Sequence, residues 1–256
     1  MHKRVAPPPS LLTRPIAHRG LHAPGTRRIE NSRAAIDAAI AAGYGLEIDV
    51  QRAACGTPVV FHDADLDRLT GQTGPVAART ASELATIPLS GSDETIPTLA
   101  EILSLIGARA PVLVEIKNQD GAGPESAALA EAVAALLSNH SGPLAVMSFN
   151  PLQIARVAEA APTLPRGLTT TDFAGPAWDA LPSPVRTALA ALAAVAPLGC
   201  GFVSHKHDAL SHPPLRTLDL PILCWTIRTE EAEARARQTA VNITFEGYLP
   251  DIPAGP

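Results

Sequence analysis

Short apolar runs alternate with longer helical stretches over most of the chain, most regularly after about residue 98. Apolar or β-branched runs between turn signals predict strands, and Ala/Leu-rich stretches with a helical period predict helices. The expected strands are 15–17, 45–51, 111–116, 144–149, 166–169, 201–204, 221–227 and 241–245, and most of the expected helices lie at 98–106, 125–138, from 151, 181–194, 213–218 and 229–239. Eight strands alternating with helices predict an α/β fold of the TIM (β/α)8 barrel class. A doubly wound open sheet is the alternative, which the lack of a Gly-rich dinucleotide loop after the first strand disfavours.

Charged residues interrupt the apolar pattern most clearly in the stretch 45–63, which reads as two short strands around a tight turn. Because side chains alternate along a strand, Glu47 and Asp49 are expected on one face and the apolar residues between them on the other. A two-residue turn at Cys55-Gly56 would place Asp49 opposite His62. We therefore expect two carboxylates and an imidazole on one patch, as long as that register holds.

The remaining segments show weaker patterns. Residues 1–14 form a Pro-rich leader in which we expect no regular structure, and residues 15–256 form a single barrel domain. Glu30-Asn31-Ser32 is expected to be the entry to a helix over the Ala-rich run 33–42, which Gly43 ends. Residues 64–97 contain no long periodic segment and are predicted to be an insertion after the second strand, a kind of excursion that is usually functional.

Composition narrows the class of protein. Apolar residues make up 46% of the chain and aromatic residues 4%, so Ala, Leu, Val and Ile must form most of the core. A net charge of −5 with no basic block argues against a nucleic-acid partner. Three cysteines without metal-ligand spacing are expected to be free thiols. The N-terminus lacks an apolar signal-peptide core and no run has transmembrane length, so we expect a cytoplasmic protein without stable membrane insertion.

Polar residues gather where the expected strands end, and active sites of such barrels form at that face. They are His18, Arg19, Glu47, Asp49, Glu115, Lys117, Ser148, Ser204, Lys206, Trp225 and Thr226. Singly, a strand-end Ser or Lys is more often a surface residue and Trp225 more often a core residue. His205, His207 and His212 are expected in a solvated loop rather than in a metal site, and His22 is interpreted in the same way despite lying near His18.

The combination predicts chemistry. Glu47, Asp49 and Glu115 form an all-oxygen set suited to one Mg²⁺ or Ca²⁺ ion, and without a cation they would repel one another. Arg19 and Lys117 add positive charge, so that the rim resembles a phosphate pocket. His18 and His62 titrate near neutral pH and could act as base and acid on a phosphodiester.

The ordered set of motifs resembles the glycerophosphodiester phosphodiesterase family, from about residue 15 to 250. The matching residues are His18-Arg19-Gly20, Glu30-Asn31, Glu47-Ile48-Asp49, Val59 to Asp63, Leu66 to Gly71, Ile96 to Leu99, Glu115-Ile116-Lys117, Ser148-Phe149 and Trp225-Thr226. Each motif alone is weak, whereas the set in this order and spacing is specific.

The resemblance implies a TIM barrel with a small insertion after its second strand and a small-molecule glycerophosphodiester substrate, cleaved to glycerol 3-phosphate and an alcohol. It implies a divalent cation on Glu47, Asp49 and Glu115, and His18 and His62 as the acid/base pair. It further implies Arg19 and Lys117 on the phosphate, Glu30 with Asn31 shaping the first loop, and Phe149 and Trp225 lining the alcohol pocket. Water and the glycerol 2-hydroxyl both remain as nucleophiles.

Two departures from the family pattern concern late segments. Arg228 stands where the family has Asn after Trp-Thr-Val, and Thr244-Phe-Glu-Gly-Tyr-Leu-Pro250 replaces a terminal Thr-Asp-x-Pro. They affect the expected head-group specificity more than the catalytic set. Alternatives are lysophospholipase D or cyclising phospholipase-type activity, or a barrel that binds phosphorylated ligands without catalysis.

Overall fold

The eight parallel strands of the sequence prediction close into a barrel. The computed structural model of the chain describes residues 2–253, and everything said of the structure refers to them. In the order of the barrel the strands are β1 (Ile16–Ala17), β2 (Gly45–Arg52), β4 (Val112–Ile116), β5 (Leu144–Ser148), β6 (Arg166–Thr170), β7 (Phe202–Lys206), β8 (Ile222–Ile227) and β9 (Asn242–Phe245). β1 pairs with both β2 and β9, which closes the ring. The TIM-barrel prediction is therefore confirmed.

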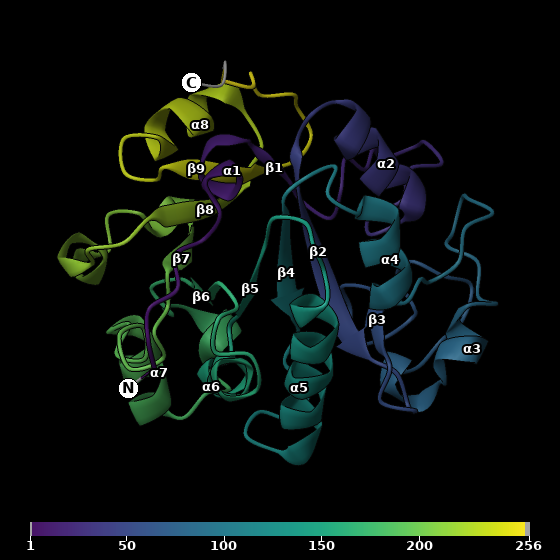
Figure 1. Cartoon of the computed structure of the whole chain (residues 1–256), viewed down its shortest axis with the longest axis horizontal. Helices are drawn as coiled ribbons and strands as arrows, with labels where there is room; N and C mark the ends of the chain where they lie inside the picture. The colour runs from purple at the N-terminus through teal and green to yellow at the C-terminus, as the bar shows by residue number, and fades with distance from the viewer. Residues whose placement is uncertain (1, 254–256) are drawn as a thin grey trace.

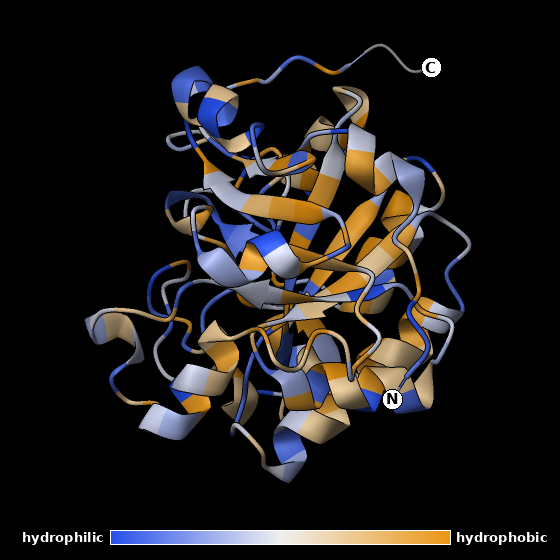
Figure 2. Ribbon diagram, turned by 90° about the vertical axis from the view of Figure 1, so that its left-hand side faces the viewer, coloured by the Kyte–Doolittle hydropathy of each residue, from blue (hydrophilic) through white to orange (hydrophobic). Residues whose placement is uncertain are grey.

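Helices surround the barrel between successive strands (Figure 1). They are α2 (Arg33–Ala41), α4 (Leu99–Ile106), α5 (Pro124–Ser138), α6 (Pro151–Ala160), α7 (Ser183–Ala190) and α8 (Glu230–Ala236), with short 3-10 turns at Val76–Ala78, Pro176–Trp178, His207–Ala209 and Pro213–Thr217. α7 is shorter than the expected helix 181–194 because the chain turns at Leu192, whose φ is 54°. Figure 2 shows apolar residues concentrated along the strands, whereas the outer helices and the loops carry a mixture of apolar and polar residues.

The outward faces of the strands and the inward faces of the helices form the main core. Leu46, Ile48 and Val50 of β2 are fully buried there, as the alternation predicted. Inside the barrel, the layer nearest the amino ends of the strands is apolar and includes Leu113 and Phe202. Gly167 of β6 is required beside that layer, because a Cβ there would lie 2.6 Å from the Phe202 ring.

The Pro-rich leader is structured, contrary to expectation. Residues Pro9–Thr13 form the helix α1, and Leu11 packs fully buried in the same apolar layer as Ile16 and Leu113. The amide of Asn242 donates to the carbonyls of Leu11 and Arg14, which fixes α1 beside β9 (Figure 1). Long-range burial decides this structure, and a five-residue helix leaves little local pattern in the sequence.

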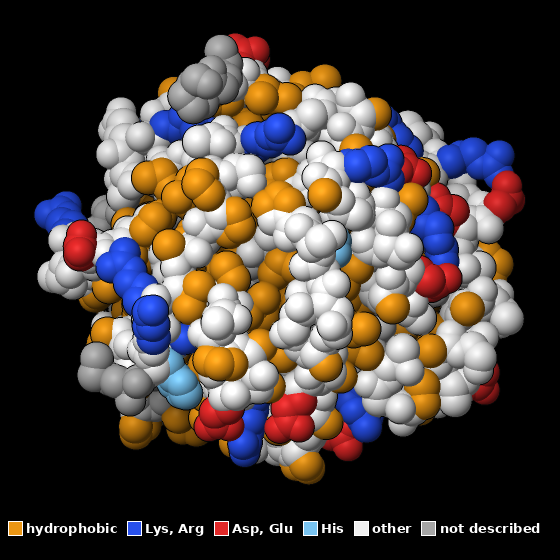
Figure 3. Space-filling model, viewed as in Figure 1, with side chains coloured by type: hydrophobic (Ala, Val, Ile, Leu, Met, Phe, Trp, Pro, Cys, Tyr) orange, Lys and Arg blue, Asp and Glu red, His pale blue; other side chains and the backbone are white. Residues whose placement is uncertain are grey.

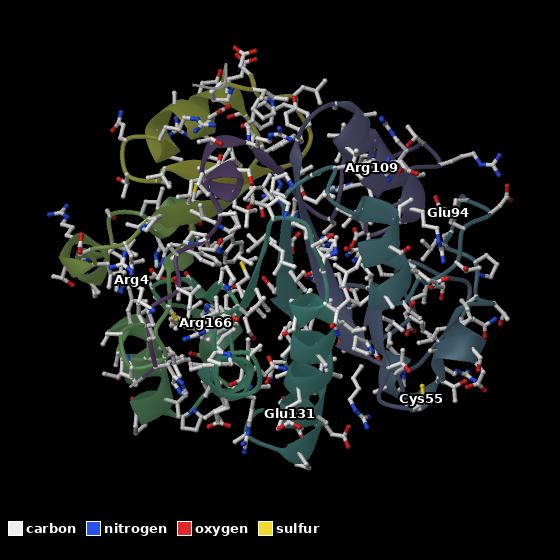
Figure 4. All side chains as sticks on the ribbon, viewed as in Figure 1. Arg4, Cys55, Glu94, Arg109, Glu131 and Arg166 are labelled. Carbon is white, nitrogen blue, oxygen red and sulfur yellow. The ribbon has the colours of Figure 1, made fainter. Side chains whose placement is uncertain are left out.

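The buried Arg166 holds the first residues of the leader. Its guanidinium donates from Nη2 to the Lys3 carbonyl at 2.8 Å and from Nε to the Leu198 carbonyl at 2.8 Å. Figure 4 shows Arg166 on the side of the barrel where the segment carrying Arg4 runs. The leader therefore belongs to the packed barrel.

Residues 64–97 leave the barrel after the hairpin strand β3 (Pro58–Val60). They contain the short helix α3 (Ala81–Leu84) and share a small apolar core with the hairpin, which includes Phe61, Leu66 and Leu84. Glu94, labelled in Figure 4, accepts hydrogen bonds from the first two amides of α2 at 2.8 Å. This ties the excursion to the helix that precedes β2.

Candidate active site

Three carboxylates meet inside the barrel at the carboxyl ends of β2 and β4. Asp49 of β2 pairs with Glu115 of β4 in the parallel register. Glu47 lies two residues before Asp49, on the same inward face of β2. They are only 2–6% exposed, and one oxygen from each lies within 4.8 Å of the others. The sequence prediction that these side chains converge therefore agrees with the structure.

The three carboxylates are electrostatically unequal. Burial, followed by the charges of Asp49 and Glu115, raises the pKa of Glu47 well above its usual range. Burial would also raise the pKa of Asp49, but the nearby charge of Lys117, followed by that of His62, holds it well below that range. A divalent cation would relieve the repulsion between the carboxylates, and an all-oxygen donor set suits Mg²⁺ or Ca²⁺. The residues thus fit such an ion.

Two cations line the same site. Lys117 Nζ lies 2.7 Å from Glu115 Oε1 and 3.2 Å from Asp49 Oδ1. Arg19 lies where the chain leaves β1 with a φ of 54°, and its Nη1 donates to Glu30 Oε1 at 2.7 Å. Asn31, next to Glu30, donates to Asp49 Oδ2 at 3.0 Å. The first loop therefore holds both Arg19 and Asp49 in place.

His18 is backed by a residue that the sequence analysis missed. Its Nδ1 lies 2.5 Å from Oε2 of Glu246, directly after β9. Glu246 Oε1 in turn accepts from Arg228 Nε at 2.8 Å. His22 Nε2 approaches Glu246 Oε2 at 3.5 Å, so His22 belongs to this cluster and not to a solvated loop. Alternation along β9 was the available signal, because Asn242, Thr244 and Glu246 fall on one face.

His62 reaches the site by a different register from the one predicted. Asp49 faces Phe61, because the hairpin closes between Ala53 and Thr57 with a three-residue loop, where a two-residue loop was expected. Gly56 has a φ of 84°, the left-handed conformation such loops require. β3 ends at Val60, so the side chain of His62 is not constrained by the ladder.

A carboxylate also backs His62. Its Nδ1 lies 2.6 Å from Asp63 Oδ1, and Arg68 Nε donates to Asp63 Oδ2 at 2.6 Å. Arg68 also donates to both oxygens of Glu30, which links the hairpin to the first loop. The arrangement around His62 therefore matches that around His18: in both, a carboxylate contacts the histidine and an arginine contacts the carboxylate.

These side chains surround a cavity of about 190 Å³. Its lining includes the predicted metal, acid/base, phosphate and alcohol-pocket residues but neither Glu30 nor Asn31, and it adds Thr226, Arg228 and Thr244. A cleft of about 560 Å³ adjoins it and shares His62, Glu115, Lys117 and Phe149 with it. Phe149 packs between Trp225 and Trp178, with ring centroids 5.5 and 5.7 Å away. Trp178 comes from the β6–α7 segment and was not predicted.

Several other strand-end residues have structural roles. His205 is fully buried at the end of β7, where it bonds Thr170 and stacks on His212, so the expectation of a solvated loop is wrong for this residue. Ser148 donates to the Ile116 carbonyl at 2.8 Å. Lys206 pairs with Asp208 in a half-exposed contact. Ser148 and His205 directly follow the inward-facing Met147 and Ser204, so their side chains lie on the opposite face of their strands from the cavity.

Three further observations concern the surface, the helices and the cysteines. On the face drawn in Figure 3, acidic and basic side chains lie in small mixed groups, with no continuous basic area on that face. Among residues 2–253, no helix has the length and apolarity needed to cross a bilayer. Cys55, Cys200 and Cys224 are free thiols.

A TIM barrel with three carboxylates, two carboxylate-backed histidines and two cations around one carboxyl-end cavity has the composition of a phosphoester-cleaving hydrolase. Comparison with known proteins agrees. Residues 18–245 match the model of the glycerophosphoryl diester phosphodiesterase family. The chain therefore belongs to this family and is an enzyme of the phosphoric diester hydrolase class.

Individual relatives support this assignment. A candidate glycerophosphodiester phosphodiesterase of Bacillus subtilis is 28% identical over 252 residues, covering 93% of this chain and 94% of the relative. A solved phosphodiesterase of Oleispira antarctica, in complex with sn-glycerol-3-phosphate, shares the fold with a TM-score of 0.74 at 24% identity, covering 93% of this chain and 94% of that one. A Thermotoga maritima glycerophosphodiester phosphodiesterase aligns with a TM-score of 0.67 at 22% identity over 96% of both chains.

Proposed function

We propose that this enzyme cleaves small glycerophosphodiesters to glycerol 3-phosphate and a free alcohol with the help of one divalent cation and two histidines. The observation that carries the proposal is the single cavity in which Glu47, Asp49 and Glu115 lie together with His18 and His62. The complex of the Oleispira antarctica relative with sn-glycerol-3-phosphate supports the same product class.

In this proposal Glu47, Asp49 and Glu115 would hold the cation, Mg²⁺ or Ca²⁺. Such an ion, when bound, neutralises negative charge that develops on the phosphoryl oxygens. Arg19 and Lys117 bring two further positive charges to the same cavity and hold the phosphate. They are kept there by Glu30, Asp49 and Glu115, so little rearrangement is needed when the phosphate arrives.

The two histidines move the protons. One imidazole accepts the proton of the nucleophile, which is water or the glycerol 2-hydroxyl, and the other donates a proton to the departing alcohol oxygen. Both occupy the cavity beside the carboxylate set, and both have Nδ1 engaged by a carboxylate, which leaves Nε2 for the reaction. The geometry is compatible with either assignment of acid and base.

The leaving alcohol is proposed to occupy the cleft that adjoins the cavity. Phe149 and Trp178 form its aromatic wall, while Asp63, Asp65 and Arg68 line its polar side. A volume of about 560 Å³ accommodates a small polar head group. A lysophospholipid would release the same alcohol and keep its acyl chain on the glycerol phosphate, so the assay below is what distinguishes the two substrates.

The test is release of glycerol 3-phosphate from glycerophosphocholine and glycerophosphoethanolamine with Mg²⁺, Ca²⁺ or EDTA. His62→Ala should lower turnover at least roughly 10²-fold, as loss of acid–base catalysis does. His140→Ala is the matched control, since His140 lies in the loop before β5 at the opposite end of the barrel. Activity that survives both EDTA and His62→Ala would disprove the proposed mechanism.

The remaining products separate the alternative activities. Accumulation of a cyclic phosphate without hydrolysis would indicate a cyclising enzyme. Cleavage of lysophospholipids in place of glycerophosphodiesters would indicate a lysophospholipase D. Each result would keep the barrel and the metal site and change the substrate or the second half of the reaction.

A further inference from the structure

Glu246 is the acidic residue closest to His18 and lies in the segment that departs from the family's terminal Thr-Asp-x-Pro pattern. Its Oε2 lies 2.5 Å from His18 Nδ1, and its side chain continues the inward face of β9 beyond Thr244. This chain has Phe245-Glu246 in the segment where the family pattern has its terminal Asp. We propose that Glu246 is the positioning residue of His18, fixing its ring and tautomer so that Nε2 serves the reaction.

The inference rests on the proposed function, in which His18 transfers a proton. A neutral imidazole carries its single proton on either nitrogen, and the partner of one nitrogen decides which. A carboxylate can only accept, so Glu246 requires the proton to be on Nδ1. Nε2 then has a free lone pair and takes the proton of the nucleophile, while the Nδ1 proton stays in place. If His18 is the acid, its imidazolium loses the Nε2 proton to the alcohol and returns to the same tautomer.

Glu246 is itself held as an ionised acceptor. Arg228 approaches its Oε1 with both Nε and Nη2, at 2.8 and 2.7 Å. The contact with His18, then that with His22, lowers the pKa of Glu246 well below its usual range, and the charge of Arg228 acts in the same direction. The carboxylate consequently stays negative and stabilises a protonated His18 by charge.

The second histidine provides an internal comparison. His62 is bound through Nδ1 by Asp63 at 2.6 Å, and Arg68 holds that carboxylate. Glu246 with Arg228 reproduces the arrangement of Asp63 with Arg68 on the other side of the cavity. Two unrelated segments, the end of β3 and the end of β9, thus supply the same support to the two proton-transfer groups.

The same atoms allow a rival occupant. Single ligand atoms of His18, His22 and Glu246 lie within 4.8 Å of one another, a set of two imidazoles and one carboxylate that a transition metal would accept. In that case Nδ1 of His18 would bind the metal. We favour the positioning role because Arg228 already neutralises Glu246, and a second cation at that carboxylate would be repelled by the guanidinium.

The experiment is a double-mutant cycle of Glu246→Gln with His18→Ala. Glu246→Gln should reduce kcat roughly 10²-fold with a KM within about threefold of the original value. In the His18→Ala background, Glu246→Gln should lower kcat less than about twofold, because a positioning residue acts only through the group it positions. Glu246→Asp, which keeps the carboxylate, should restore part of kcat.

The pH profile supplies a second readout. Because a carboxylate stabilises the imidazolium, Glu246→Gln should move one limb of the kcat/KM profile to lower pH and leave the other limb in place. Equal losses in both backgrounds would overturn the inference in favour of a structural role. A stoichiometric transition metal in the purified enzyme that Glu246→Gln releases would overturn it in favour of a second metal site.

The outcomes also separate this inference from the proposed function. If His18→Ala leaves turnover unchanged, the assignment of His18 as a catalytic residue fails. If His18→Ala abolishes turnover while Glu246→Gln matches the original enzyme in kcat and pH profile, the catalytic role stands and the positioning role alone is refuted.

Discussion

The three buried carboxylates predict a link between metal binding and stability that can be measured without substrate. Glu47, Asp49 and Glu115 place one oxygen each within 4.8 Å of the others, and the ion pairs with Lys117 and Arg19 offset part of their charge. A cation that binds the folded chain but not the unfolded one stabilises it by RT ln(1 + [L]/Kd). At one hundred times Kd this is about 2.7 kcal/mol.

For a chain of 256 residues, that stabilisation corresponds to a rise in Tm of about 5–10 °C. We expect it on titrating the EDTA-treated protein with Mg²⁺ or Ca²⁺ in a calorimeter. Glu47→Gln should abolish most of the rise and should raise the Tm of the metal-free protein, because a neutral amide of similar size replaces a carboxyl that its neighbours repel. Glu131→Gln, on α5, is a matched control that should retain the full rise.

The pH dependence has a defined sign. The pKa of Glu47 is raised above its ordinary value of 4.5, so between those two pKa values the folded chain binds more protons than the unfolded one. Metal-free stability should therefore fall as pH rises through this window, and Glu47→Gln should flatten the slope. An equal metal-induced rise in the original protein and in Glu47→Gln, or none at millimolar Mg²⁺ and Ca²⁺, would refute the assignment of the site.

Three predictions concern the end of the barrel that carries no catalytic residue, and each predicts unchanged kcat. Leu11→Ala should lower the free energy of unfolding by about 2–5 kcal/mol because it empties a fully buried position; a denaturant midpoint unchanged from the original would contradict it. Arg166→Met removes the hydrogen bonds to the carbonyls of Lys3 and Leu198 and should lower the free energy of unfolding by about 2–5 kcal/mol. A decrease of less than about 1 kcal/mol would show that these bonds to the leader are dispensable. Gly167→Ala should lower the free energy of unfolding by about 1–3 kcal/mol, because its Cβ would clash with the Phe202 ring. Adding Phe202→Leu should restore part of this stability.

The barrel was predictable because its signal is repeated along the chain. Each parallel strand leaves an apolar run, and each helix leaves a periodic one, so errors at one boundary do not change the topology. The convergence of Glu47, Asp49 and Glu115 was predictable for a related reason: strand parity together with the polarity of a barrel already fixes the face and the end on which these residues lie.

The hairpin shows where such reasoning fails. One additional loop residue changes the partner of Asp49 from His62 to Phe61, and the sequence Ala54-Cys55-Gly56 is compatible with two-residue and three-residue loops. His62 still reaches the cavity because β3 ends at Val60 and frees the chain beyond it. The predicted proximity was therefore obtained from a wrong register.

The structure of the leader and the position of Glu246 were not predicted, for two different reasons. α1 depends on contacts of Leu11 with strands more than a hundred residues away, and such contacts leave no local period in the sequence. Glu246, in contrast, follows the rule that identified the other site residues, since it lies on the inward face just beyond β9. The segment departs from the family pattern, so that pattern gives no indication of Glu246, whereas strand parity does.

The two ends of the barrel divide stability and chemistry between them. At the amino end, Leu11, Leu113 and Phe202 fill the interior with apolar side chains that favour the folded state without a ligand. At the carboxyl end, buried carboxylates and cations lose hydration, and their mutual contacts return only part of that cost. The metal-free site is then a source of instability, which a bound cation and substrate would relieve. Conservative neutral replacements at the carboxyl end should accordingly raise stability while removing activity, and truncations at the amino end should lower stability and leave kcat unchanged. A site variant such as Glu47→Gln that lost both activity and metal-free stability would show that the carboxylates also serve to hold the barrel together.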